Sequence, residues 1–190
     1  MFKDDKSNSL KKLDYAIKNK LADEAVLPFL KIINNTDFFY TTSSCYGRIT
    51  IDKSDLAINK KTHEWIAKYH RCIKDSELSD ALNKDSSDVV WVRNLPFIMH
   101  VCTKDIDSAE KFLKLTKTQG LKRCGIMQLK PRIFVELRGE DVVEIPAKYK
   151  NKFLINKDET EKITEILNHS FLKNKERLEK LFREFEIIFA

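Results

Sequence analysis

Glycine is scarce in this sequence of 190 residues, which contains only four glycines and four prolines. The glycines form neither the G-x-G-x-x-G pattern nor a P-loop, the turns that cradle phosphates at a helix N-terminus. The sequence therefore does not support a Rossmann-type nucleotide pocket. No apolar run reaches the roughly 18–20 residues that a membrane-spanning helix needs, so we expect no membrane association.

The sequence also lacks the signals of a secreted protein. Residues 1–9 are polar and do not resemble a secretory signal. We therefore expect a cytoplasmic protein with free thiols at its four cysteines, Cys45, Cys72, Cys102 and Cys124. A chain of this length can bury a sizeable core without disulfides or metals, so we expect one domain over 1–190.

Charged residues are abundant, and the balance is basic. The chain has 35 lysines and arginines against 29 acidic residues, a net charge of +6 and a pI near 9.0. A basic balance fits a polyanionic partner such as RNA, DNA or an acidic membrane. Many lysine-rich proteins are merely soluble, however, so charge alone leaves both interpretations open.

The hydrophobic spacing predicts an α+β protein. Apolar residues at helical spacing predict helices over 8–19, 23–34, 76–83, 105–119 and, as a long charged C-terminal helix, 158–188. Runs of β-branched and aromatic residues predict strands over 38–42, 48–51, 65–72, 89–92, 97–102, 125–129 and 132–137. This order favours a single compact domain with a mixed β-sheet flanked by helices, outside the Rossmann class.

The most unusual segment is Thr41–Arg48, which reads TTSSCYGR between two predicted strands. Its four consecutive hydroxyl residues offer several hydrogen-bond donors in one place. Gly47 allows the backbone to approach a ligand closely, and the guanidinium of Arg48 suits a carboxylate or a phosphate. A polar hairpin turn has a similar composition, so a binding site and a plain turn both stay open.

Two histidines each stand two residues before a cysteine: His70 before Cys72, and His100 before Cys102. Residues i and i+2 of a strand share a face, so two such pairs on neighbouring strands would supply a Cys₂His₂ zinc site. The usual C-x-x-C spacing is missing. We therefore favour histidines in a core or cleft over a metal centre.

Lys122 and Arg123 stand between Gly120 and Gly125, after a predicted helix and before a predicted strand. The two cations are suited to holding phosphates. A glycine-capped helix end with solvated basic side chains is the alternative interpretation.

Several segments, in order along nearly the whole chain, match the motifs of one family. Thr41–Arg48 is similar to the signature TTSSC-x-GR, with Asn34 and Asp37 before it at the expected offsets. Further matches are Pro96–Val101 to P-F-hydrophobic-hydrophobic-H-V, residues 109–125 to a helix followed by G-F-[KR]-x-S-G, and Arg138 with residues 144–146 to V-R…E-V-P. On these motifs the chain resembles the tRNA wybutosine-synthesising methyltransferases.

The resemblance implies a methyltransferase with a compact α/β fold outside the Rossmann class. Such an enzyme transfers a methyl group from S-adenosylmethionine to a ring nitrogen of 4-demethylwyosine, or of its side-chain-bearing form, in tRNA(Phe). The base lies beside the anticodon in a single-stranded loop and can be drawn out without breaking a duplex. No metal and no obligate protein partner is implied. Tyr46, Leu121 and Cys124 depart from the family pattern.

The resemblance also implies roles for single residues. Methyl transfer needs alignment of the reactants and removal of a proton from the ring nitrogen. The candidates for the base are His100, which matches a motif and is our first choice, His70 and Asp37. The candidates for the donor or substrate pocket are Ser43, Ser44, Gly47, Arg48 and Arg138, of which the two arginines suit the donor's carboxylate.

The candidates for RNA contact are Lys122 and Arg123, for phosphates, and Tyr46, for stacking on a base. Tyr40 and Trp65 are further aromatic candidates, although we expect Trp65 to pack in the core. A non-catalytic RNA-binding module on the same scaffold is the alternative to an enzyme, and zinc-dependent hydrolysis is a third hypothesis.

Overall fold

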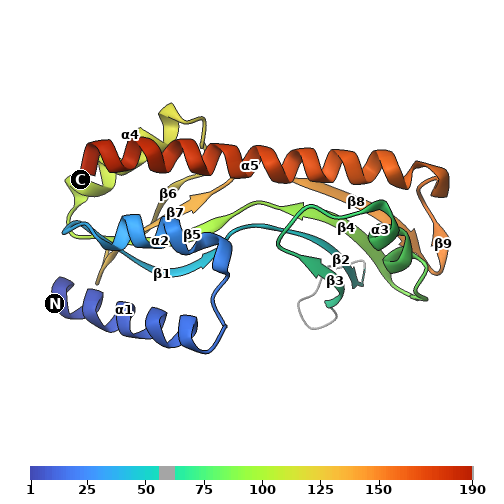
Figure 1. Ribbon diagram of the computed structural model, residues 1–190, viewed down its shortest axis with the longest axis horizontal. Coiled ribbons are helices and arrows are strands. Elements are labelled where there is room, and N and C mark those ends of the chain that lie inside the picture. The colour runs from blue at the N-terminus through green and yellow to red at the C-terminus, as the bar shows by residue number, and fades with distance from the viewer. Residues whose placement is uncertain (56–62, 190) are drawn as a thin grey trace. The chain divides into compact units, whose positions relative to one another are not determined.

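The computed structural model describes residues 1–55 and 63–189, and the chain divides into two compact units. Unit 1 contains residues 1–46, 97–140 and the chain from 175 onward, and unit 2 contains residues 47–96 and 141–174. Each unit has its own antiparallel sheet (Figure 1). The α+β class and the long C-terminal helix are confirmed. One methyltransferase domain over 1–190 stays a prediction. Every described helix is too short or too polar to span a membrane.

Unit 1 is built on a four-stranded sheet. Its order is β1 (Phe39–Cys45), β5 (Ile98–Thr103), β7 (Ile133–Arg138) and β6 (Gly125–Gln128), and neighbouring strands run antiparallel. The helical elements of this unit are α1 (Phe2–Lys18), η1 (Glu24–Val26), α2 (Leu27–Asn34), α4 (Ile106–Thr118) and the second half of α5 (Thr160–Phe189). Asp105 caps α4 with its carboxylate, and Gly120 ends the turn after it at φ 75°.

Aromatic side chains fill the core of unit 1 on one face of this sheet. Phe39 of β1 lies 5.2 Å from Phe112 of α4 and 5.4 Å from Phe185 of α5, ring centre to ring centre. Phe185 also lies 5.2 Å from Phe112, and all three rings are fully buried. The opposite face meets α1 through Phe2, whose ring lies 5.2 Å from Tyr40. The two faces therefore differ in their helical cover.

Unit 2 is built on a five-stranded antiparallel sheet. Its order is β3 (Glu64–Tyr69), β2 (Arg48–Ser54), β4 (Val89–Leu95), β8 (Val143–Tyr149) and β9 (Lys152–Phe153). The helical elements are α3 (Asp75–Leu82), η2 (Lys157–Glu159) and the first half of α5. One face, with Ile49, Ile51, Val90 and Val92, is fully buried.

The structure differs from the predicted elements in several places. The strands form two antiparallel sheets instead of one mixed sheet, and β8 and β9 were not expected. The strand predicted over 38–42 continues to Cys45, so Ser43 and Ser44 lie in β1 and not in a turn. The helix predicted over 8–19 already begins at Phe2. The helix predicted over 23–34 begins with the 3-10 turn η1, which Asp23 caps.

We predict that the buried aromatic core dominates the stability of unit 1. Phe185→Ala removes a fully buried ring and should lower the free energy of unfolding by about 3–5 kcal/mol, because it leaves a cavity among rings that cannot close up. Ile187→Ala, on the same helix but 76% exposed, should change it by less than about 0.5 kcal/mol. Urea unfolding followed by circular dichroism measures both. Equal effects of the two variants would contradict this account of the core.

Candidate active site

A β-bulge in β1 determines which side chain faces His100. Thr41 pairs with Val101 and Ser43 pairs with His100, so Thr42 is an extra residue in β1. Bulges redirect side chains and often lie beside active sites. Without this extra residue Thr42 would stand opposite His100. On the other side of β5, His100 pairs with Glu136 of β7, so Ser43, His100 and Glu136 stand in one row across three strands.

Asn34 at the end of α2 holds the chain next to this bulge. Its side-chain oxygen accepts from the Thr41 amide at 2.8 Å, and its side-chain nitrogen donates to Thr41 Oγ1 at 2.9 Å. The amide that borders the bulge is therefore satisfied by a side chain. Asn34 was matched to a family motif from the sequence, and this contact gives it a structural role.

Ser43, His100 and Glu136 form a continuous hydrogen-bonded row. Ser43 Oγ lies 2.7 Å from His100 Nδ1, and His100 Nε2 lies 3.1 Å from Glu136 Oε2. An ionised carboxylate only accepts hydrogen bonds, so the neutral imidazole carries its proton on Nε2 and its Nδ1 accepts from the Ser43 hydroxyl. The His100 side chain is 37% exposed and that of Glu136 is 17% exposed. The row is thus open to a ligand at Ser43, while its carboxylate end is more shielded.

A pocket of about 260 Å³ lies beside Ser43 in unit 1. One wall is the stretch Thr41–Ser44 of β1, and the other includes Lys12 and Ala16 of α1. This volume is below the roughly 300–1,000 Å³ of ligand pockets, so it suits one part of a larger substrate. Both serines predicted for the donor or substrate pocket line it.

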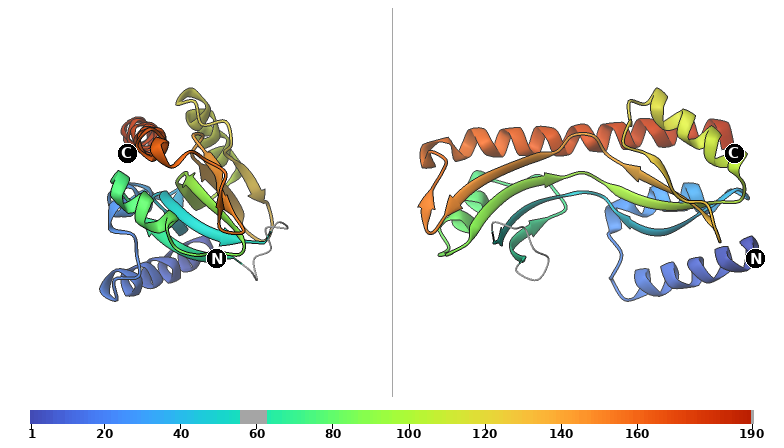
Figure 2. Two further views of the ribbon diagram at one scale, coloured as in Figure 1. Left: turned by 90° about the vertical axis from the view of Figure 1, so that its right-hand side faces the viewer. Right: turned by 180° about the vertical axis from the view of Figure 1, so that it is seen from behind.

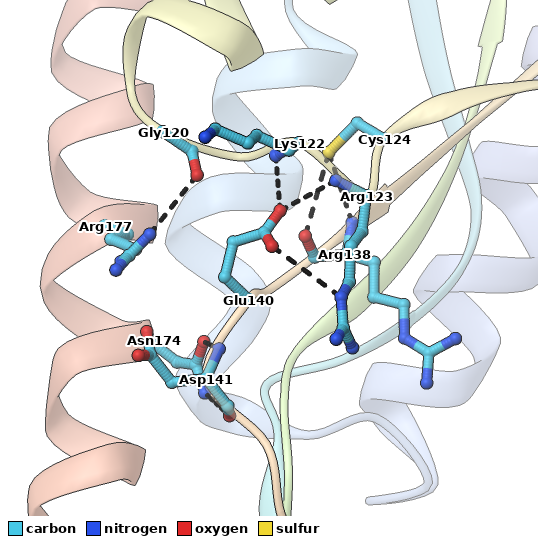
Figure 3. Close-up of polar contacts among 9 residues, drawn as sticks. All are labelled: Gly120, Lys122, Arg123, Cys124, Arg138, Glu140, Asp141, Asn174 and Arg177. Carbon is cyan, nitrogen blue, oxygen red and sulfur yellow. Dashed lines mark hydrogen bonds and ion pairs between the residues drawn. The ribbon is translucent and has the colours of Figure 1, made fainter.

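Arg138 presents a cation on the same sheet face as this row. It follows Glu136 by two positions on β7, so both side chains point to one side. Its backbone is held by Cys124, whose sulfur accepts from the Arg138 amide at 3.4 Å and donates to the Arg138 carbonyl at 3.7 Å. Burial raises the pKa of the Cys124 thiol, which therefore stays protonated. Within residues 1–55 and 63–189 the Arg138 guanidinium has no ion pair, and it points away from Glu140 (Figure 3).

The loop that carries Lys122 and Arg123 is held by hydrogen bonds to the carboxylate of Glu140. The backbone amides of both residues donate to Glu140 Oε1, the second at 2.7 Å, and Arg123 Nε lies 3.7 Å from Glu140 Oε2 (Figure 3). Arg177 Nη1 donates to the Gly120 carbonyl at 3.2 Å. The backbone donors are therefore engaged, and the side chains of Lys122 and Arg123 are exposed.

The other predicted site residues do not join the row. Asp37 is exposed in the turn before β1 and lines a separate pocket of about 510 Å³. His70 belongs to unit 2, where its Nδ1 donates to the Gly47 carbonyl at 3.0 Å. Gly47 has φ 99°, a conformation that requires glycine. Among the described residues, the two histidine–cysteine pairs weighed for zinc form no common cluster of ligand atoms.

Two aromatic predictions are reversed by the observed exposure. Tyr46, predicted to stack on RNA, is only 8% exposed, and its ring stacks on Phe29 at 6.1 Å. Trp65, predicted to pack in the core, is 40% exposed, with the Arg48 guanidinium 4.9 Å above its ring. Tyr40 is fully buried, and burial raises the pKa of its phenol. The turn position of Tyr46 suggested exposure, but its ring folds back into unit 1.

The comparisons with known proteins define the class of this protein and then its family. The family model described as Methyltransferase TYW3 matches residues 4–187. The protein is therefore a methyltransferase, with antiparallel sheets in place of a Rossmann sheet. It belongs to the Methyltransferase TYW3 family.

Relatives and a solved structure agree over most of the chain. A Methanocaldococcus jannaschii protein named tRNA(Phe) 7-((3-amino-3-carboxypropyl)-4-demethylwyosine(37)-N(4))-methyltransferase is 39% identical over 148 residues, 76% of either chain. A Pyrococcus furiosus protein of the same name, numbered 2, is 31% identical and covers 95% of this chain and 88% of its own. The structure of the PH1069 protein from Pyrococcus horikoshii matches with a TM-score of 0.92 at 28% identity, over 97% of this chain and 95% of that one.

We predict that the burial of Tyr46 is visible in the pH dependence of stability. Burial first, and then the charges of Glu179 and Asp23, raise the pKa of Tyr46 to about 12 from an ordinary value of 10.0. A raised pKa of a phenol favours the fold below pH 10, and this stabilisation is lost as the pH rises from 10 toward 12. Wild type should therefore lose more stability than Tyr46→Phe over this range in urea unfolding. Parallel curves would mean that Tyr46 is accessible to solvent.

Proposed function

We propose that this methyltransferase methylates N4 of 4-demethylwyosine, or of its 7-(3-amino-3-carboxypropyl) form, in tRNA(Phe), with S-adenosylmethionine as the methyl donor. The target lies beside the anticodon, and the enzyme acts in the cytoplasm. The names of the archaeal relatives specify the 3-amino-3-carboxypropyl form and position 37, which favours that form. The observation that carries the proposal is the Ser43–His100–Glu136 row in a chain of this family.

The row supplies what the reaction requires of the protein, a place for the proton of the ring nitrogen. When bound, S-adenosylmethionine would supply the methyl group for the new nitrogen–carbon bond, with the electron pair of the broken carbon–sulfur bond left on sulfur. The nitrogen's proton passes to Ser43 Oγ while the Ser43 proton passes to His100 Nδ1. Glu136 then stabilises the imidazolium through Nε2, because the opposite charges lie within hydrogen-bond distance.

Arg138 is our choice for the carboxylate of the methyl donor. Its guanidinium has the fork geometry that binds a carboxylate with two parallel hydrogen bonds. It has no ion pair among the described residues and shares a sheet face with Glu136. Arg48, the other arginine considered from the sequence, already stacks on Trp65 in unit 2. We assign Ser44 to the same pocket as Ser43, and the side chains of Lys122 and Arg123 to tRNA phosphates.

The proposed function is tested by methyl transfer to the modified tRNA. Purified protein is incubated with S-adenosylmethionine and tRNA(Phe) carrying either unmethylated tricyclic base, and the digested nucleosides are analysed by mass spectrometry. We expect one added methyl group on the tricyclic base. Binding of tRNA without methyl gain on either form would overturn the proposal and favour an RNA-binding module.

The donor site is tested in the same assay through the Michaelis constant for S-adenosylmethionine. Arg138→Ala should raise it about ten- to a hundredfold, because a charged hydrogen bond contributes roughly 1.5–3 kcal/mol. Arg183→Ala removes an exposed cation elsewhere in unit 1 and should leave it unchanged. Similar values for both variants would exclude Arg138 from donor binding.

We predict that His100 is the proton acceptor of the Ser43–His100–Glu136 row. His100→Ala should lower kcat by about 10²–10⁴-fold with the fold intact, because a positioned base contributes that much to proton removal. Glu136→Gln should also lower kcat, and it should favour the wrong tautomer, because a side-chain amide can donate to Nε2. His169→Ala, at an exposed position of α5, is the matched control. A His100→Ala variant with wild-type kcat would show that the nitrogen loses its proton without this row.

A further inference from the structure

Both tryptophans of the chain lie in one row on one face of the unit 2 sheet. Trp65 of β3 pairs with Asp52 of β2, and Asp52 pairs with Trp91 of β4. Paired residues of antiparallel strands point to the same side of the sheet, and the sequence contains no other tryptophan. The opposite face is the one with Ile51 and Val92. The tryptophan row therefore belongs to the face that the hydrophobic core of unit 2 does not use.

Helices cover the core face. On the opposite face Trp65 and Lys68 are exposed, whereas Thr50, Asp52 and Ser54 are fully buried. Asn94, on the core face, donates to Ser170 of α5 at 2.8 Å. Lys148, on the same face, donates to the Leu82 carbonyl at the end of α3 at 2.9 Å. Figures 1 and 2 show α3 and the first half of α5 on one side of this sheet. The exposure of Trp65 on the other side is thus a property of the architecture of unit 2.

Each indole is paired with an arginine. The Arg48 guanidinium lies 4.9 Å above the Trp65 ring, and that of Arg93 lies 4.9 Å above the Trp91 ring. Arg93 is further held by Asp52 and Glu144, each 3.7 Å away. No carboxylate pairs with Arg48 among the described residues. The Arg48–Trp65 pair is therefore a flat, cationic surface whose charge is not cancelled locally.

The orientation of the Trp65 ring is held by His63 and Asp52. The His63 ring meets it edge-on at 4.2 Å, and His63 Nε2 lies 3.2 Å from the fully buried carboxylate of Asp52. Lys68 pairs with Thr50, which puts it on the same face, and it is exposed. The Arg48–Trp65 pair and Lys68 thus offer an aromatic ring and cations. The Asp52 carboxylate is buried, and the half-exposed Glu144 carboxylate on this face is paired with Arg93.

We propose that this face, through the Arg48–Trp65 pair, binds unpaired RNA nucleotides by stacking. Bases stack on aromatic rings and on guanidinium planes without regard to sequence. The cations of Arg48 and Lys68 attract the phosphates that link the nucleotides. A fixed ring loses little conformational entropy on binding. Paired RNA does not offer base faces to such a surface, so the occupant is a single-stranded loop. The inference rests on the proposed tRNA substrate, and it adds a binding surface in unit 2 to the proton row of unit 1.

Tryptophan fluorescence tests the inference without any methyl donor. The Trp91→Phe variant leaves Trp65 as the sole tryptophan. We expect the unmodified anticodon stem-loop of tRNA(Phe) to quench its fluorescence, and a fully paired duplex of equal length to quench it much less. Equal quenching by both RNAs, or binding of the stem-loop without quenching, would overturn the stacking surface. Failure of the stem-loop to bind at all would overturn it as well.

The affinity of the stem-loop separates stacking from a structural role of the ring. Trp65→Ala should weaken binding about tenfold, because one stacked base is lost, whereas Trp65→Phe should stay close to wild type. Arg48→Ala should weaken binding and reduce its salt dependence by about one phosphate contact. Tyr15→Ala removes an aromatic ring that is 65% exposed in unit 1 and should have no effect. Unchanged affinity of Trp65→Ala would overturn the inference. These readouts involve no methyl transfer, so they hold or fail independently of the proposed reaction.

Discussion

The register of β5 against its two neighbours is the constraint on which the candidate site depends. A shift of one residue in a strand turns every side chain to the other face. The extra residue Thr42 makes such a shift within β1, and it changes the partner of His100 from Thr42 to Ser43. Met99 and Val101 stay in the core while His100 points to the other face. The same pairing that buries the core thus assembles the polar row.

The sequence predicted part of this site and missed the rest for a physical reason. His100 and Ser43 were chosen as candidates because they belong to recognisable motifs, and the structure places their side chains together. Glu136 was missed, because a lone glutamate in an alternating strand is typical of a solvent-facing position, and its role depends on which strand becomes the neighbour. The bulge was invisible for the same reason: four consecutive hydroxyl residues suit a strand or a turn, and the pairing with β5 decides between them.

The fold class followed from the sequence more reliably than the exposure of single residues. Periodicity predicted the helices and most of the strands. It did not predict β8, because Pro146 stands inside that strand and a proline argues against a strand. Tyr46 and Trp65 were reversed because exposure depends on tertiary contacts. Phe29 of α2 and the turn at Gly47 bring Tyr46 inward, whereas Trp65 lies on the sheet face opposite α3 and the first half of α5.

The antiparallel pairing explains why the candidate sites lie on sheet faces and not at a glycine-rich turn. Parallel sheets bind ligands beyond the carboxyl ends of their strands, where helix N-termini and glycine turns meet phosphates. Antiparallel sheets bury one face and leave the other for polar side chains. Unit 1 carries the Ser43–His100–Glu136 row on that second face, and unit 2 carries the tryptophan–arginine pairs there. In each unit, alternation along the strands separates the core from the candidate site, which lies beside α1 in unit 1 and opposite α3 in unit 2.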